Sequence, residues 1–99
     1  PLAREWPDDP DVLYNLALLE LKAGEYSLAR TLLERLVSLD PENAEGWYYL
    51  AACEVQDGEF DAARDKLGRA ITLDATLGDV WRADRRFEGL RRRGLAPSV

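Results

Sequence analysis

The stretch GEYSLAR at residues 24–30 returns thirty-four residues later as GEFDAAR at residues 58–64. Gly, Glu, Ala and Arg hold the same places in both, and an aromatic residue follows the glutamate each time. The likeness extends outward, because residues 10–43 laid without a gap over residues 44–77 have 12 identical positions. A fixed period of this length is typical of repeat architectures, in which each copy is one supersecondary unit. The chain therefore contains two copies of one folding unit.

Each copy predicts two helices joined by a tight turn. In the first copy, Asp9 can cap a helix that starts at Pro10, and apolar residues recur at helical spacing until Gly24. From Tyr26 a second apolar stripe runs toward Pro41, which cannot continue a helix begun before it. A glycine at the turn permits the positive φ that ends the first helix. Small residues should stand where the paired helices come close: Ala17, Ala29, Ala51 and Ala63.

The segment before the first copy follows the same period. Residues 1–9 are in phase with the last turn of a preceding second helix, so we interpret Leu2 and Trp6 as the remnant of an upstream repeat. The chain also begins at Pro1 and contains no Met. We therefore expect a processed product or a piece of a longer protein.

The segment after the second copy starts a third and then departs from it. Within residues 78–94, Asp84 and Arg85 stand where both full copies have Leu and Ala, and a charged pair there cannot receive a packed partner helix. We predict one capping helix over residues 79–93, ended by Gly94 and followed by a tail at residues 95–99. Its inward side chains should be Val80, Ala83, Phe87 and Leu90.

Composition excludes several functional classes. The net charge is −6, and it divides into 16 acids and 7 bases over residues 1–77 against 3 acids and 6 bases over residues 78–99. An acidic body with one basic end lacks the broad basic field that nucleic-acid binding needs. Histidine is absent and Cys53 is the one thiol, buried among apolar neighbours, so we expect no catalysis, no metal site and no cofactor.

The sequence contains no recognisable membrane-spanning or signal segment. No apolar run approaches the roughly 20 residues that span a bilayer, and no basic-then-apolar signal sequence opens the chain. We therefore expect one soluble domain without membrane insertion, located in the cytoplasm.

The two copies resemble the tetratricopeptide repeat. That motif asks for a bulky aromatic, Leu and a small residue, then Gly followed by an aromatic, then Ala, a bulky apolar residue, Ala and Pro. The second copy offers Trp47, Leu50, Ala51, Gly58, Phe60, Ala63, Leu67 and Ala70, with Ala75 in place of the proline. The first copy offers Leu13, Leu16, Ala17, Gly24, Tyr26, Ala29, Leu33 and Pro41, and departs at Leu13 for the aromatic and at Leu36 for the last small residue. The resemblance implies an all-α superhelix of helix-turn-helix repeats, about five helices in a single domain.

A second stripe on the first helix of each repeat is the candidate site. By resemblance it lines the concave face, where proteins of this family hold an extended peptide or a helix from a partner. The candidate groove residues are Tyr14, Leu18, Leu21, Tyr48, Tyr49, Val55, Arg82 and Arg86. The alternative is that Leu18, Leu21 and Val55 only pack between neighbouring repeats. The positions at which some relatives clamp a C-terminal carboxylate hold residues that mostly cannot donate strongly, so that ligand is not implied: Tyr14, Leu18, Tyr49, Asp79 and Ala83.

These observations favour a non-catalytic module that binds a protein or peptide partner in the concave groove. The alternative is a structural spacer, or a self-associating segment of a longer array; exposed apolar surface on the first helix would then give a weak homodimer. A third possibility is a scaffold beside an enzyme domain. The arginine run at residues 91–93 can either offset a helix dipole or dock an acidic partner.

Overall fold

The computed structural model describes residues 8–97, which are helical and contain no strand. The predicted upstream remnant, Leu2 and Trp6, lies outside the described residues. The helices, in chain order, are α1 (Pro10–Lys22), α2 (Tyr26–Leu39), α3 (Ala44–Gln56), α4 (Phe60–Leu73), α5 (Leu77–Ala83), the 3-10 turn η1 (Arg85–Phe87) and α6 (Glu88–Arg92). The predicted all-α class is confirmed.

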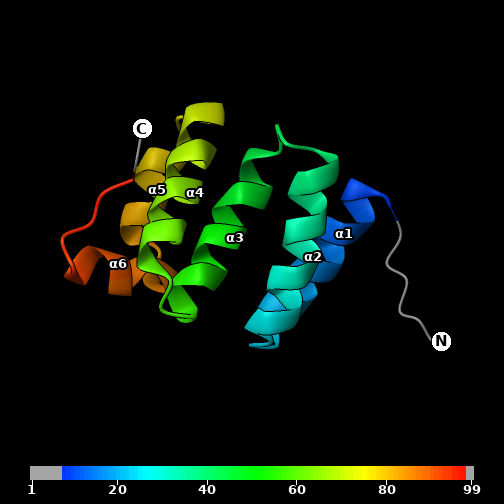
Figure 1. The fold of residues 1–99 in the computed structure, drawn as a ribbon, viewed down its shortest axis with the longest axis horizontal. Coiled ribbons are helices and arrows are strands. Elements are labelled where there is room, and N and C mark those ends of the chain that lie inside the picture. The colour runs from blue at the N-terminus through cyan, green and yellow to red at the C-terminus, as the bar shows by residue number, and fades with distance from the viewer. Residues whose placement is uncertain (1–7, 98–99) are drawn as a thin grey trace.

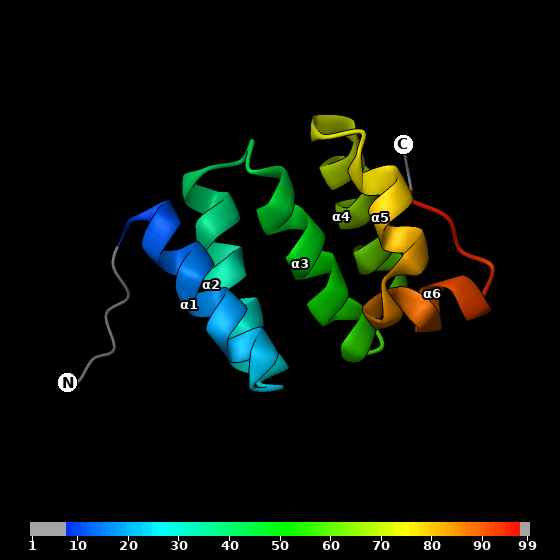
Figure 2. The ribbon, with the colours of Figure 1, turned by 180° about the vertical axis from the view of Figure 1, so that it is seen from behind.

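The helices stack as pairs along one direction. Figures 1 and 2 show α1 with α2 at one end, α3 with α4 beside them, and the short helices α5 and α6 at the other end. The molecule is accordingly elongated, measuring 44 × 24 × 20 Å along its principal axes. No helix within residues 8–97 is long and apolar enough to cross a membrane.

The helix ends are formed by the residues that the sequence indicates. The Asp11 amide donates to Asp9 Oδ1 at 3.0 Å at the start of α1, and the Gly46 amide donates to Asn43 Oδ1 at 2.9 Å at the start of α3. Such side-chain caps satisfy amides that have no partner within the helix. The turn glycines Gly24 and Gly58 have φ of 78° and 77°. Both predicted turns are therefore confirmed.

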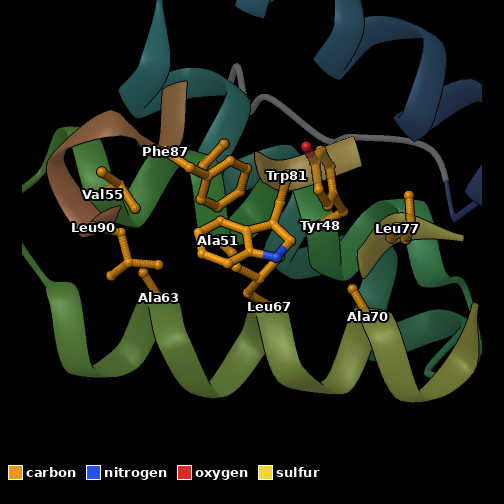
Figure 3. Close-up of a cluster of buried hydrophobic side chains, with 11 residues drawn as sticks. Tyr48, Ala51, Val55, Ala63, Leu67, Ala70, Leu77, Trp81, Phe87 and Leu90 are labelled. Atoms are coloured by element: carbon orange, nitrogen blue, oxygen red, sulfur yellow. The ribbon is translucent and has the colours of Figure 1, made fainter. Parts of the chain in front are cut away.

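Two apolar cores hold the pairs together. The first joins α1 and α2 to one side of α3, and it is rich in leucine: Leu13, Leu21, Leu32, Leu33, Leu36 and Leu50. The second joins α3 and α4 to the segment from α5 to α6, and Figure 3 shows its rings, Tyr48, Trp81 and Phe87, beside the small side chains of α4. The four alanines expected at close helix approaches are all completely buried: Ala17, Ala29, Ala51 and Ala63.

The predicted capping helix is wrong as a single helix. It breaks at Asp84, whose backbone is extended (φ −87°, ψ 118°), so residues 8–97 hold six α-helices rather than about five. The Asp84 carboxylate accepts from the Arg86 amide at 3.0 Å and from the Tyr48 hydroxyl at 2.8 Å, and such local bonds compete with helix formation. Phe87 and Leu90 are buried as predicted, whereas Val80 is 48% exposed. Ala83 is also exposed.

An ion cluster joins the two repeats where α2 meets α3, a contact that we name the repeat junction. Arg30 of α2 lies 2.7 Å from Asp57, 3.0 Å from Glu59 and 3.4 Å from Glu54. Glu54 is only 1% exposed, and Lys66 Nζ donates to its Oε2 atom at 2.7 Å. Burial raises the pKa of Glu54, although the Lys66 hydrogen bond acts in the opposite direction. Two cations thus compensate one buried carboxyl group.

Cys53 lies at the same repeat junction. Its side chain is completely buried, in the core that α2 shares with α3. Burial raises the pKa of this thiol to about 12, so it stays protonated at neutral pH. In the folded protein Cys53 therefore packs as a small apolar side chain.

Candidate functional site

A hollow lies where α1, α3 and the 3-10 turn meet. It is lined by Leu18, Leu21, Lys22, Tyr49 and Arg86, and its volume is about 310 Å³. The two leucines and the tyrosine ring supply an apolar floor, and the two cations supply the polar lining. Surfaces that combine an apolar centre with a few charged groups are typical of protein interfaces. We call this hollow, together with the adjoining Tyr14 ring, the groove.

Arg86 is positioned by bonds to Asp84. Its Nε and Nη2 atoms donate to the two oxygens of Asp84 at 3.0 and 2.9 Å, and the Tyr48 hydroxyl donates to the same carboxylate. Burial alone would raise the pKa of Asp84, but the hydrogen bonds from Arg86 and Tyr48 hold it below its usual value. The Asp84 hydrogen bond in turn raises the pKa of Arg86. This ion pair therefore fixes the Arg86 guanidinium at the edge of the groove, where the Asp84 carboxylate compensates its charge.

The aromatic rings form a continuous row beside Arg86. The Tyr14 and Tyr49 centroids are 6.1 Å apart, Tyr49 meets Tyr48 edge-on at 5.4 Å, and Tyr48 lies 5.0 Å from Phe87. The Arg86 guanidinium stands 5.1 Å from the Tyr49 centroid, within the range of a cation–π contact. Burial, and then the neighbouring Tyr49, raise the pKa of Tyr14 to about 12. The row leaves Tyr14 and Tyr49 partly exposed and covers Tyr48.

Five of the eight sequence-predicted residues border the groove. Leu18, Leu21, Tyr49 and Arg86 line it, and Tyr14 adjoins Tyr49. Tyr48 and Val55 are 2% and 6% exposed and belong to the second core, so they offer no surface to a partner. Arg82 lines a separate hollow with these neighbours: Ile71, Gly78, Trp81, Ala96 and Pro97.

The residues of the expected stripe do not share one exposed surface, and the reason is physical. This expectation assumed that Tyr48 and Arg82 continue the exposed line of Tyr14 at the same 34-residue spacing. The break at Asp84 instead folds Phe87 over Tyr48 and leaves Arg82 on the outside of α5. The expectation that Tyr48, Val55 and Arg82 belong to the groove is thereby corrected. Lys22 was missed, although its position in the last turn of α1, next to Leu21, was a usable signal.

Comparison with known proteins agrees with this architecture. The sequence profile of the tetratricopeptide repeat matches residues 14–78, which is well over half of the chain. No curated protein matches the sequence significantly. Repeats of this type generally mediate protein–protein interactions and are typically non-catalytic. On its profile match and its paired helices, the chain belongs to the tetratricopeptide repeat family.

Proposed function

We propose that the chain binds a segment of a partner protein in the groove and performs no catalysis of its own. The observation that carries the proposal is the composition of the hollow, in which Leu18, Leu21 and Tyr49 lie between two cations, Lys22 and Arg86. The Asp84 carboxylate compensates Arg86, so Lys22 supplies the excess positive charge of this lining, on a protein whose net charge is −6. A carboxylate of the partner would be attracted to that lysine.

The expected ligand is a peptide with apolar anchors and one acidic group. Asp84 already holds the Nε and Nη2 atoms of Arg86, so a partner carboxylate would approach through Arg86 Nη1 and Lys22 Nζ. The apolar anchors would cover Tyr49 and Leu18, since aromatic side chains tend to dominate binding energy at interfaces. A fixed arginine also loses little conformational freedom when it binds, which favours affinity.

The test is a selection of peptides from a random display library on the wild-type protein, followed by titration of the enriched peptides. We expect peptides that combine an acidic residue with apolar residues. Tyr49→Ala should weaken their binding by about 2 kcal/mol or more, and Lys22→Ala should weaken it mainly at low salt. Arg92→Ala is the charge control, because Arg92 pairs with Glu88 on an exposed turn of α6.

The outcomes separate a binding module from a spacer. A spacer would enrich no peptides whose binding depends on Tyr49. If Arg92→Ala reduced affinity while Tyr49→Ala and Lys22→Ala did not, the partner would recognise the basic C-terminal segment, and the groove proposal would be wrong.

A further inference from the structure

A second hollow lies between α4, α5 and the chain that follows α6, and we name it the α5 hollow. Its volume is about 280 Å³. One of its residues comes from the last turn of α4, three come from α5 and two follow α6: Ile71, Gly78, Trp81, Arg82, Ala96 and Pro97. It shares no lining residue with the groove, which is formed by α1, α3 and the 3-10 turn. Its role is therefore independent of the groove.

The walls of the α5 hollow are held in place by contacts with other parts of the chain. The Trp81 carbonyl oxygen accepts from Arg91 Nη1 at 2.6 Å, and the indole ring meets Phe87 edge-on at 6.3 Å. The Ala96 carbonyl oxygen accepts from Arg64 Nε at 2.9 Å. Figures 1 and 2 show the chain returning from α6 to α5. The hollow is therefore already formed in the folded chain, and a preformed site favours binding because little has to be ordered.

Gly78 leaves space in the α5 hollow that the fold does not require. It is not among the glycines with positive φ, and among the described residues an added Cβ would meet Ile71 Cγ2 at 3.7 Å and nothing closer, which is an ordinary contact. The 34-residue period places Ala44 at the corresponding position of α3. Glycine within a helix is also less favourable than alanine. The effect of the glycine is therefore to leave room beside Ile71.

The lining combines apolar surface with one cation. Ile71, Trp81 and Pro97 supply aliphatic and indole surface. Arg82 is exposed, and within the part of the chain that the structure describes it forms no ion pair. The described residues that line the hollow include no carboxylate. The charge of Arg82 is therefore available to a ligand, unlike the compensated charge of Arg86 in the groove.

We propose that the α5 hollow binds a small carboxylic acid whose apolar part is an aromatic ring or a branched aliphatic group. The apolar part lies against Trp81 and Ile71, and the carboxylate accepts two hydrogen bonds from the Arg82 guanidinium, whose paired N–H donors match this geometry. One cation matches one negative charge, so a carboxylate fits better than a phosphate monoester, which carries more. The volume is slightly below the range of about 300 to 1,000 Å³ that is typical of ligand sites, so the ligand is small.

The spacing on α5 sets the length of this acid. Gly78 and Arg82 are four residues apart, and such residues lie on one face of a helix, about 5 to 6 Å from each other. The apolar group and the carboxylate must span a similar distance, as they do in an acid with two carbons between its ring or branch and its carboxylate. A segment of a partner protein would need both groups within that distance and would have to leave past residues 96–97, which form one wall. A small acid fits more simply.

The probe is 3-phenylpropanoate, titrated against the whole 99-residue protein and followed through the backbone amide signals in proton–nitrogen NMR spectra. We expect saturable shifts at Gly78, Trp81 and Arg82. The neutral amide of the same acid should bind about fivefold more weakly, because it lacks the charge that pairs with Arg82. Acetate, a carboxylate without a large apolar group, should cause no saturable shift at these residues.

Two pairs of variants locate the site. Gly78→Val places a side chain in the α5 hollow and should weaken binding about tenfold or more, whereas Ala83→Val, at an exposed position of α5 outside the lining, should not. Arg82→Gln should reduce the affinity for the acid to that for the amide and leave amide binding unchanged. Arg85→Gln, at an exposed arginine outside the lining, should change neither. Should Gly78→Val fail to fold, Gly78→Ala makes the same test.

The outcomes also distinguish this site from the groove. Lys22→Ala should leave binding of the acid unchanged, because Lys22 lines only the groove. Equal affinities for acid and amide, equal losses in Gly78→Val and Ala83→Val, or a loss in Lys22→Ala would overturn the proposal. It would also be overturned if neither 3-phenylpropanoate nor the branched acid 4-methylpentanoate gave saturable shifts. A display-selected peptide whose binding depended on Gly78 and Arg82, with no binding of either acid, would assign the hollow to a protein segment instead.

Discussion

The protein has two junctions between groups of helices, and each is formed by different residue types. The repeat junction between α2 and α3 is packed with leucines and carries Glu54, compensated by Arg30 and Lys66. The cap junction, where α5, η1 and α6 meet α3 and α4, is packed with rings and carries Asp84, compensated by Arg86. The first uses residues at repeating positions, whereas the second depends on residues that break the pattern. A repeat can propagate through the first kind of junction and is ended by the second.

The largest effect is expected from breaking the cap junction. Phe87 is completely buried between Tyr48 and Trp81, so Phe87→Ala should lower the free energy of unfolding by about 3 to 5 kcal/mol. Val80→Ala, at a residue 48% exposed, should change it by less than about 0.5 kcal/mol. Urea denaturation measures both. Similar midpoints for the two variants would mean that the cap is a loose appendage rather than part of the second core.

The next effect compares two arginines at the same place in the two repeats. Arg30→Ala removes one of the two cations at buried Glu54 and should cost about 1 to 3 kcal/mol. Arg64 donates instead to one backbone oxygen, that of Ala96, at 2.9 Å, so Arg64→Ala should cost about 1 kcal/mol or less. Thermal unfolding of the two variants side by side gives the comparison. A larger loss for Arg64→Ala would contradict the importance given to the repeat junction.

The smallest effects concern pH, and the two junctions should respond with opposite signs. The raised pKa of Glu54 means that its contribution to stability is present below the unfolded value, about 4.3, and is lost as the pH rises through the folded value. The lowered pKa of Asp84 means that its contribution is present above the unfolded value, about 3.9, and is lost as the pH falls through the folded value.

The variants Glu54→Gln and Asp84→Asn separate these contributions. Between about pH 3 and pH 7, Glu54→Gln should become more stable relative to wild type as the pH rises, and Asp84→Asn should become less stable. The measurement is the urea midpoint of each variant against wild type at each pH. Parallel profiles for the two variants would show that overall charge, and not the local environment of each carboxyl group, sets the pH dependence.

The sequence predicted the repeating part of the fold because each signal there acts locally. Gly24 and Gly58 end helices through their own backbone freedom, and Asp9 and Asn43 accept from amides two or three residues away. Ala29, a small residue expected at a close helix approach, is completely buried. A period repeated twice therefore carried enough information to pair the helices.

The cap, and the burial or displacement of Tyr48, Val55 and Arg82, could not be predicted in the same way. Asp84 leaves the helix partly because of the hydroxyl of Tyr48, which is 36 residues away in the sequence. That bond cannot be inferred from an apolar pattern. Tyr14 and Tyr48 occupy identical places in their repeats, yet only Tyr48 is buried by Phe87.

The single cysteine makes the repeat junction measurable without any mutation. Cys53 is completely buried, and its pKa of about 12 keeps it unreactive while α2 stays on α3. A thiol reagent at neutral pH can therefore label the chain only when that contact opens. Because the sequence contains one cysteine, the labelling rate follows a single event in a single place. Labelling of Cys53 therefore reports that the contact between the two repeats has opened. A partner that binds across both repeats should lower the labelling rate.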